Sequence, residues 1–170
     1  ELAAAVTAGI LTLSEGARVV VCRSRAQALA EGKGAMAALG LSELEAQPFL
    51  EAFDLELAAI NGPQGITVAG EHEAVAALGA HLESPEDSSL PTAPPGTFFR
   101  RLDVSVPFHC RLMDPAESLF RDALGRVETA PARVPFVSTV SGGVVAGAAL
   151  DVDYWWNNIR QAVRFFPGVQ

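Results

Sequence analysis

The sequence has 170 residues, 49% of them apolar, which is enough for one domain with a substantial core. Its formal net charge of −8 argues against nucleic acid as a general partner, because phosphate binding requires a basic surface. It contains no apolar run of about eighteen residues, so we expect no membrane span. Its two cysteines, Cys22 and Cys110, fit neither a metal motif nor a disulfide scaffold, and they favour a reducing cytoplasm and no metal site.

The first 34 residues predict two helices. An Ala- and Leu-rich run over residues 1–13 forms the first, and Gly9 marks its end or a close packing point. Ser14 is the expected N-cap of the second helix, which continues to about Glu31. One set of residues recurs at helical spacing in this second helix and is expected to face the core: Ala17, Val20, Val21, Ser24 and Ala28.

Residues 35–106 predict a ferredoxin-like unit, because their pattern gives the order strand, helix, strand, strand, helix, strand. His72 and His81 on the second helix fall on different faces, so we interpret both as solvated groups and not as a metal pair. The predicted strands cover 35–39, 56–61, 66–70 and 98–106, the helices 42–53 and 71–82, and a proline-containing surface loop 83–97.

In the remaining segment, Asp114 and Pro115 predict a helix from about 115 to 127. The continuous apolar run 134–140 predicts a buried strand of a parallel sheet. The adjacent tryptophans at 155–156 predict an aromatic packing corner.

His109 stands two residues after Pro107, at the mouth of a predicted strand-to-helix turn. An imidazole titrates near neutral pH and can both take and return a proton. From these residues alone, a catalytic base and a histidine bonded to backbone both remain open.

A set of motifs along the whole chain resembles the acyltransferase domain of bacterial modular polyketide synthases, in the malonyl-CoA:acyl-carrier-protein transacylase family. The most telling are Val106-Pro107-Phe108-His109 and Tyr154-Trp155-Trp156-Asn157-Asn158-Ile159-Arg160; the others lie at 1–9, 21–25, 59–63, 135–142 and 163–165. The resemblance implies an α/β fold. An α/β-hydrolase-like large subdomain (1–34 and 107–170) would carry an inserted ferredoxin-like small subdomain (35–106), with the N-terminal part of the large subdomain missing.

The resemblance also implies an enzyme that moves a malonyl-type extender unit from coenzyme A, through an acyl-serine, to the phosphopantetheine thiol of an acyl carrier protein. His109 would be the general base, oriented by the main-chain carbonyl of Asn158, and Arg23 would bind the malonyl carboxylate. The substrate would be malonyl-CoA, with no bound cofactor. The implied partners are the carrier protein and neighbouring synthase domains such as the ketosynthase, with no nucleic acid and no membrane.

One part of the family pattern does not occur in the chain. The family's nucleophile lies in Gly-His-Ser-x-Gly, and Glu1 resembles the residue that follows this motif, so the serine would stand three residues before Glu1. Ser24, Ser138 and Ser141 lie in no such pattern. We therefore expect these residues alone to be inactive and to expose surface that the missing strands would cover.

The implied substrate-binding residues are Val106, Pro107, Phe108 and Asn61, although a hairpin-turn role is equally open for Asn61. Phe108 matches the malonyl pattern and Val106 matches neither the malonyl nor the methylmalonyl pattern, so methylmalonyl or another acyl unit remains an alternative. A serine hydrolase of related fold is a second alternative, and it needs no Arg23. Exposed arginines, Arg100 and Arg111 among them, are expected to guide an acidic carrier protein.

Overall fold

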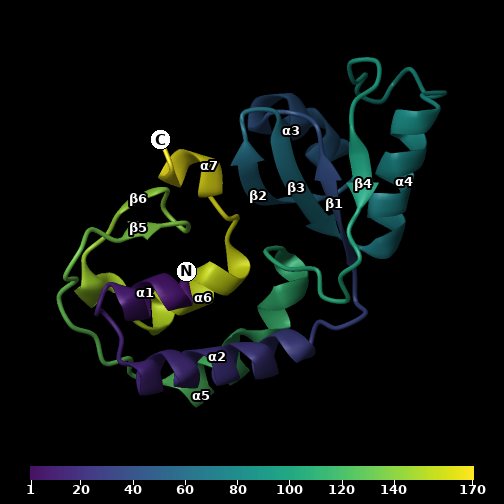
Figure 1. Cartoon of the computed structure of the whole chain (residues 1–170). Helices are drawn as coiled ribbons and strands as arrows, with labels where there is room; N and C mark the ends of the chain where they lie inside the picture. The colour runs from purple at the N-terminus through teal and green to yellow at the C-terminus, as the bar shows by residue number, and fades with distance from the viewer.

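A computed structural model describes all 170 residues of the chain. The elements in chain order are α1 (Leu2–Thr7), α2 (Leu13–Ala28), β1 (Ala35–Leu39), α3 (Glu43–Ala52), β2 (Glu56–Gly62), β3 (Gly65–Gly70), α4 (His72–Glu83), β4 (Phe99–Arg101), the 3-10 helix η1 (Arg111–Ala116), α5 (Glu117–Leu124), β5 (Val137–Ser138), β6 (Gly143–Val144), the 3-10 helix η2 (Gly147–Ala149), α6 (Val152–Arg160) and α7 (Phe165–Gly168). Two lobes result: one holds β1 to β4 with α3 and α4, and the other holds α1, α2, α5 and α6 (Figure 1).

The smaller lobe is built on an antiparallel sheet with the strand order β2-β3-β1-β4. This order is ferredoxin-like, and the predicted sequence of strands and helices is confirmed. Local signals set the elements: Ser42 and Glu45 form a capping box at the start of α3, and the turn between Gly62 and Gly65 joins β2 to β3. The subdomain boundaries 1–34, 35–106 and 107–170 stay predictions.

The two faces of this sheet pack against different partners. Side chains of one face, such as Leu39, Ile66 and Val68, are buried with Phe49 of α3 and Leu78 of α4. This face forms the core of the smaller lobe. Its residues alternate along each strand with those of the opposite face, because successive side chains of a strand point to opposite sides of the sheet.

The opposite face of the sheet supports the loop that carries His109. Met36, Ala58 and Ala69 are buried together with Cys110, which directly follows His109 in the chain. The segment from β4 to η1 therefore runs between the two lobes (Figure 1).

The larger lobe has a separate core of 19 buried residues, to which α1, α2, η1, α5 and α6 all contribute. Trp155 and Trp156 are buried in it, and the ring of Trp156 lies 6.1 Å from that of Phe120 between centroids. The predicted aromatic packing corner is confirmed.

The helices at the start of the chain differ from the prediction in their bounds and in their buried face. The first helix ends at Thr7, and α2 begins after Thr12, whose side chain accepts a hydrogen bond from Glu15 N–H, so the predicted Ser14 cap is wrong. Val20 and Val21 are 47% and 48% exposed. The residues of α2 that are buried instead are Gly16, Val19, Cys22 and Ala26.

Small side chains explain this reversed face. A Cβ built on Gly16 would lie 2.7 Å from Val6 Cγ2, so the missing side chain lets α1 and α2 approach closely. Where two helices approach this closely, the size of the side chains, rather than their hydropathy, determines which face of the helix is buried. The exposed side of α2 instead borders an apolar hollow of about 380 Å³ shared with α1, and its lining includes Leu2, Leu13 and Val20.

The segment around the predicted helix 115–127 is also different. Residues 111–116 form a 3-10 helix with Pro115 inside it, and α5 then covers only Glu117–Leu124. Asp114 does not cap a helix, because its carboxylate bonds Arg160. The strand predicted over 98–106 is shorter in the structure, where β4 covers only Phe99–Arg101. This edge strand pairs only with β1, and only at three positions.

The apolar run 134–140 is not a buried parallel strand. Only Val137–Ser138 is strand, and it pairs antiparallel with Gly143–Val144. Val134 is 54% and Val137 41% exposed. Phe136, by contrast, is buried in the core of the larger lobe, so the run is buried at some positions and exposed at others.

The structure also bears on the interpretation of His72 and His81 and of the two cysteines. His81 is buried, its Nε2 lies 2.8 Å from the Pro91 carbonyl oxygen, and its ring packs near Phe53, so its interpretation as a solvated group is wrong. His72 contacts the Gly32 carbonyl oxygen at 3.1 Å. Both cysteines are buried free thiols, and no helix combines the length and hydropathy needed to span a bilayer.

Candidate active site

His109 lies in a tight loop between β4 and η1. Its φ of 62° places it in the left-handed region, which is uncommon and strained for a residue with a side chain. The loop is closed locally, because the Phe108 N–H donates to Val106 O at 3.0 Å and Cys110 Sγ donates to Pro107 O at 3.2 Å. These contacts aim the imidazole away from the buried Cys110.

The imidazole is held by a carbonyl from the far end of the chain. His109 Nδ1 lies 2.8 Å from the main-chain oxygen of Gln161, so Nδ1 carries the proton and donates it. Nε2 has no hydrogen-bond partner within the chain and is left to accept a proton. The arrangement orients the ring as a base.

The carbonyl that holds the ring is not that of Asn158, so this part of the sequence prediction is wrong. Asn158 lies inside α6, where main-chain carbonyls point along the helix axis. Gln161 is the C-cap of α6, and its extended backbone, φ −79° and ψ 155°, turns its carbonyl out of the helix.

The surroundings of His109 keep the ring neutral. Burial, together with the positive charge of Arg23, lowers the pKa of His109 to about 4, and the bond to Gln161 offsets only part of this effect. At neutral pH the imidazole is therefore unprotonated and available to take a proton.

Arg23 comes from α2 and is held in place by the side chain of Asn158. Its guanidinium donates to Asn158 Oδ1 at 2.6 Å. Burial lowers the pKa of Arg23 and the carboxylate of Glu1 raises it, and a guanidinium stays protonated at any ordinary pH. The structure thus brings the two predicted site residues His109 and Arg23 close enough for the charge of one to affect the other.

The carboxylate of Glu1 accepts hydrogen bonds from two other segments, α6 and the residue after β5. Asn158 Nδ2, the Tyr154 hydroxyl and the Thr139 hydroxyl all donate to it. The Tyr154 hydroxyl oxygen in turn accepts from the Ser138 hydroxyl, whose Oγ lies 2.7 Å away. We call Glu1, Ser138, Thr139, Tyr154 and Asn158 the Glu1 cluster; it fixes the amide that in turn fixes Arg23.

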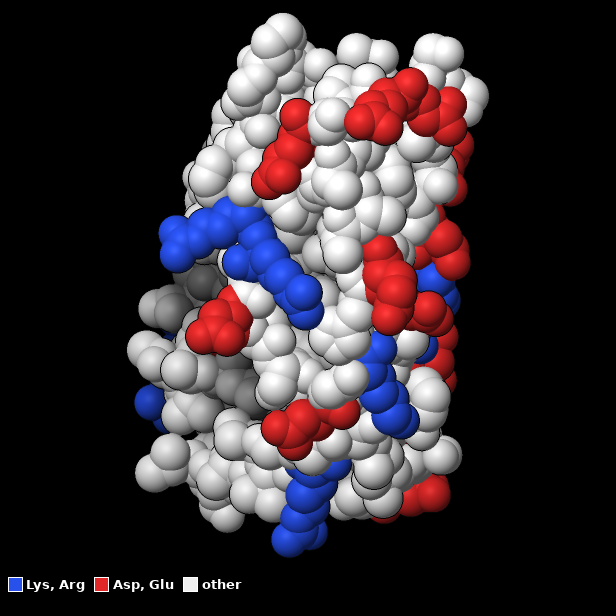
Figure 2. Space-filling model, turned by 90° about the vertical axis from the view of Figure 1, so that its right-hand side faces the viewer, with Lys and Arg blue, Asp and Glu red and all other residues white.

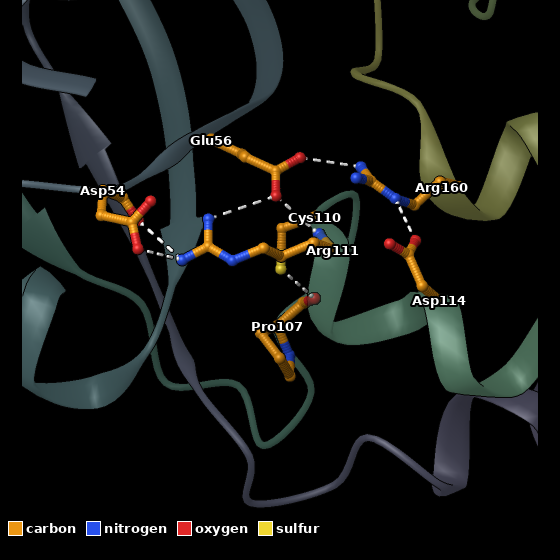
Figure 3. A network of polar contacts seen from close by, with 7 residues as sticks. All are labelled: Asp54, Glu56, Pro107, Cys110, Arg111, Asp114 and Arg160. Carbon is orange, nitrogen blue, oxygen red and sulfur yellow. Dashed lines mark hydrogen bonds and ion pairs between the residues drawn. The ribbon is translucent and has the colours of Figure 1, made fainter. Parts of the chain in front are cut away.

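A second carboxylate, Glu56 of β2, contacts the segment that follows His109 at Arg111 (Figure 3). Its partners are the main chain and guanidinium of Arg111 and the guanidinium of Arg160. Arg111 also pairs with Asp54 at 2.6 Å, and Arg160 with Asp114. We call Asp54, Glu56, Arg111, Asp114 and Arg160 the Glu56 cluster.

The predicted substrate residues lie in two places. The Phe108 ring is 6.3 Å from the His109 ring between centroids, and Pro107 is buried beneath the same loop. Val106 packs against the core of the larger lobe. Asn61 donates to Thr67 Oγ1 at 3.0 Å across the β2–β3 hairpin, which agrees with the hairpin role.

The cavities of the chain do not include His109 or Arg23. The largest, of about 610 Å³, lies between the start of α3, the β2–β3 turn and α7. His109 and Arg23 are both half-buried and lie outside these cavities. No group of three His, Cys, Asp or Glu side chains is placed to hold a metal ion.

Comparison with known proteins decides the family. The family model described as the acyl transferase domain matches residues 1–170. The chain belongs to this acyl transferase family. It is 39% identical over 168 residues to the polyketide synthase GfsB of Streptomyces halstedii, and 36% identical over 171 residues to the erythronolide synthase EryA2 of Saccharopolyspora erythraea.

Solved acyltransferase domains share the fold. The loading acyltransferase of the avermectin modular polyketide synthase superposes with a TM-score of 0.86 at 34% identity, over 98% of this chain and 51% of that chain. The acyltransferase domain from module 8 of the salinomycin polyketide synthase gives a TM-score of 0.89 at 33% identity, over 99% and 38%. The predicted fold class, a large subdomain with a small ferredoxin-like one, is confirmed, and the relatives are enzymes.

The acyltransferase chain spans only part of each relative. The match with GfsB spans 97% of this chain but 3% of GfsB, and the match with EryA2 spans 99% of this chain but 4% of EryA2. The similarity therefore concerns one domain of these synthases.

Sequence reasoning missed three members of the site. Gln161 contributes only a main-chain carbonyl, for which residue type gives no signal. Glu1 is the N-cap of α1, and Tyr154 is a buried residue of α6 whose hydroxyl needs a partner. That requirement is the signal by which Tyr154 could have been found.

Proposed function

We propose that this acyltransferase domain moves a malonyl-type extender unit from coenzyme A, through an acyl-serine, to the phosphopantetheine thiol of an acyl carrier protein. The observation that carries the proposal is the neutral His109 ring, bonded at Nδ1 to Gln161 and open at Nε2, beside the guanidinium of Arg23. An acyl group with a free carboxylate fits this pair, because His109 would act as the base at the reacting carbonyl and Arg23 would bind the carboxylate.

In the first half-reaction, His109 Nε2 takes the proton of a serine hydroxyl as the serine oxygen attacks the thioester carbonyl. The tetrahedral intermediate collapses, the carbon–sulfur bond breaks, and the coenzyme A thiolate leaves with the proton returned by the imidazolium. The 170 residues contain no Gly-His-Ser-x-Gly motif, and none of their serines bonds His109, so the proposed serine belongs to a segment outside them.

In the second half-reaction, the carrier thiol loses its proton to the same Nε2 and attacks the acyl-serine. The serine oxygen leaves and regains the proton from His109, which restores the starting state. The hydrogen bond to Gln161 keeps Nδ1 protonated throughout, so each proton passes through Nε2 alone.

Arg23 would bind the free carboxylate of the malonyl group. A guanidinium presents two parallel donors to a carboxylate, and Asn158 occupies one of its nitrogens from the side. Acyl groups without a carboxylate would leave this half-buried guanidinium without an anionic substrate partner, which supports selection of dicarboxylic units.

Phe108 would choose between malonyl and methylmalonyl. Its ring lies beside that of His109, where an added methyl group would need room. We expect Phe108→Ala to raise kcat/KM for methylmalonyl-CoA relative to malonyl-CoA by roughly 10- to 200-fold, in competition assays with both substrates. An unchanged ratio would remove Phe108 from the selection.

The carrier protein, a neighbouring ketosynthase domain and a cytoplasmic location belong to the same proposal. Arg100 and Arg101 are exposed on β4, whereas Arg111 is already paired with Asp54 and Glu56 and has little charge to offer. On the face that Figure 2 presents, basic and acidic side chains are interspersed. Steering of an acidic carrier would therefore depend on Arg100 and Arg101 more than on Arg111.

The test is label transfer. A protein in which a Gly-His-Ser-x-Gly segment precedes Glu1 is incubated with radiolabelled malonyl-CoA and then with a phosphopantetheinylated carrier protein. The proposal predicts label first on the protein and then on the carrier. Label released as free malonate at the same rate with and without carrier would point to a hydrolase and contradict the proposal.

A further inference from the structure

We propose that Glu56 is a positioning residue for the pair formed by the His109 imidazole and the Gln161 carbonyl. The inference rests on the proposed role of His109 as the base. It assigns to the ferredoxin-like lobe a task in catalysis that is separate from substrate binding.

The first support is the hold of Glu56 on the segment after His109. Glu56 Oε1 accepts a hydrogen bond from the main-chain N–H of Arg111 at 2.8 Å. Arg111 stands two residues after His109 and begins η1. A hydrogen bond from a backbone N–H to a carboxylate is among the stronger hydrogen bonds in proteins. It therefore fixes the main chain at Arg111, where the loop that carries His109 ends.

The second support is the hold of Glu56 on the segment before Gln161. Glu56 Oε2 lies 2.9 Å from a guanidinium nitrogen of Arg160, the last residue of α6. Arg160 is bonded at the same time to Asp114 of η1. Figure 3 shows the carboxylate of Glu56 between Arg111 and Arg160.

The third support is backbone pairing by the same strand. Ile60 N–H of β2 donates to Val163 O at 2.8 Å, and Val163 N–H donates to Ala58 O at 2.9 Å. The segment just after Gln161 is thus an added, short parallel partner of β2. One strand holds the chain on both sides of the Gln161 carbonyl, by its Glu56 side chain before it and by its main chain after it.

These contacts matter because His109 and Gln161 are 52 positions apart in the chain. Their 2.8 Å bond needs two segments to be held in register, and Glu56 binds both Arg111, two residues after His109, and Arg160, directly before Gln161. The carboxylate is only 27% exposed, so solvent screens these interactions incompletely. Removing it should loosen the imidazole without touching Arg23.

The experiment follows His109 directly, by the pH titration of its ring resonances in protein labelled with ¹³C at histidine Cε1. The chain has three histidines, so the signal is assigned with a His109→Asn variant. In Glu56→Ala we expect the His109 midpoint to rise from about 4 toward 6.5, because a loosened ring is better solvated. Glu56→Gln keeps an acceptor for Arg111 N–H but loses the pair with Arg160, and should give a smaller rise.

The matched control is Asp54→Asn. Asp54 binds only the side chain of Arg111 within the Glu56 cluster, and asparagine tolerates its φ of 54°. This variant should leave the His109 midpoint unchanged. A His109 midpoint that stays at the wild-type value in both Glu56 variants, or moves equally in Asp54→Asn, would overturn the inference.

A second readout is acyl transfer by the protein with the preceding serine motif. Glu56→Ala should lower kcat on the order of tenfold to a hundredfold, the range that misplaced catalytic groups give, with KM for malonyl-CoA unchanged. A fall in kcat without a shift of the His109 midpoint contradicts the inference. A shift of the midpoint in a protein that transfers no acyl group supports the positioning by Glu56 and contradicts only the proposed function.

Discussion

Two carboxylates organise the site from different lobes, and they do so by different means. Glu1 gathers neutral donors, the amide of Asn158 and the hydroxyls of Tyr154 and Thr139, and through Asn158 it fixes Arg23. Glu56 gathers cationic and main-chain donors, and it fixes the segments around His109. The comparison separates a cluster that holds Arg23, the proposed substrate-binding cation, from a carboxylate that holds the segments around His109, the proposed base.

This separation has a kinetic meaning. Damage to the Glu1 cluster should act through the binding of the acyl carboxylate, and loss of Glu56 through the placement of the imidazole. Substitutions on the two sides should therefore change KM and kcat separately.

Apart from loss of the proposed base itself, the largest effect is expected at Arg23. Arg23→Ala should lower kcat/KM for malonyl-CoA by about 1.5–3 kcal/mol, roughly tenfold to 150-fold, because hydrogen bonds to a charged partner are lost. The loss should lie in KM. Steady-state kinetics with malonyl-CoA, and with acetyl-CoA as the substrate that lacks a carboxylate, measure it.

Arg23→Lys serves as the control, since it keeps the charge but loses the planar pair of donors and should recover only part of the activity. If Arg23→Ala slowed transfer from both thioesters equally, the guanidinium would not be reading the carboxylate.

The next effect concerns the packing beneath the His109 loop. A Cβ on Gly34 would lie 2.6 Å from Leu112 Cδ1 and 3.0 Å from Pro107 Cβ, and closer still to the Gly70 carbonyl oxygen. Gly34→Ala should therefore lower the free energy of unfolding by about 1–3 kcal/mol, the usual cost of overpacking. Urea denaturation measures this change.

Gly62→Ala is the matched control for this substitution, because a Cβ at Gly62 meets nothing within 4 Å. It should change stability far less. Because restriction of the unfolded chain by alanine would on its own stabilise both variants, equal losses at Gly34 and Gly62 would mean that contact with Pro107 and Leu112 is not the cause of the loss at Gly34.

The smallest effect is the pH dependence of stability. The pKa of His109 is about 4 in the folded chain and near 6.5 for a free imidazole, so the unfolded chain binds more protons between these values. Stability from this group should be complete above pH 6.5, fall as the pH drops toward 4, and change no further below. Partial solvent screening leaves about 1 kcal/mol of this effect by roughly pH 5.

Urea denaturation at about pH 7.5 and about pH 5 gives the difference, and His109→Asn should show it reduced by the same amount. A wild-type chain whose unfolding energy depends on pH no more than that of His109→Asn would place the imidazole in solvent and contradict its lowered pKa.

The ferredoxin-like lobe could be predicted from sequence because its signals are local. Ser42 caps α3, the Gly62–Gly65 turn joins two strands, and alternation gives the buried face of β1. The larger lobe offers fewer such signals. The buried face of α2 includes Gly16 and Ala26, which are small enough to allow close packing. Their hydropathy gives almost no signal that they are buried.

The site divides in the same way. His109 and Arg23 could be predicted, because an imidazole and a guanidinium are chemically distinctive. Their supports could not: Gln161 acts through a carbonyl that every residue has, and Glu56 lies 53 positions before His109 in the sequence. Asn158 was expected to orient the base, and its side chain instead holds Arg23.

The most direct test of the account is the single-turnover rate of acyl-enzyme formation from malonyl-CoA, in wild type and in His109→Ala, with the serine motif preceding Glu1. We predict that the substitution lowers this rate by roughly 10²- to 10⁴-fold while malonyl-CoA still binds, as expected for the loss of a general base. A His109→Ala rate within about twofold of wild type, far below the contribution of a general base, would contradict the account.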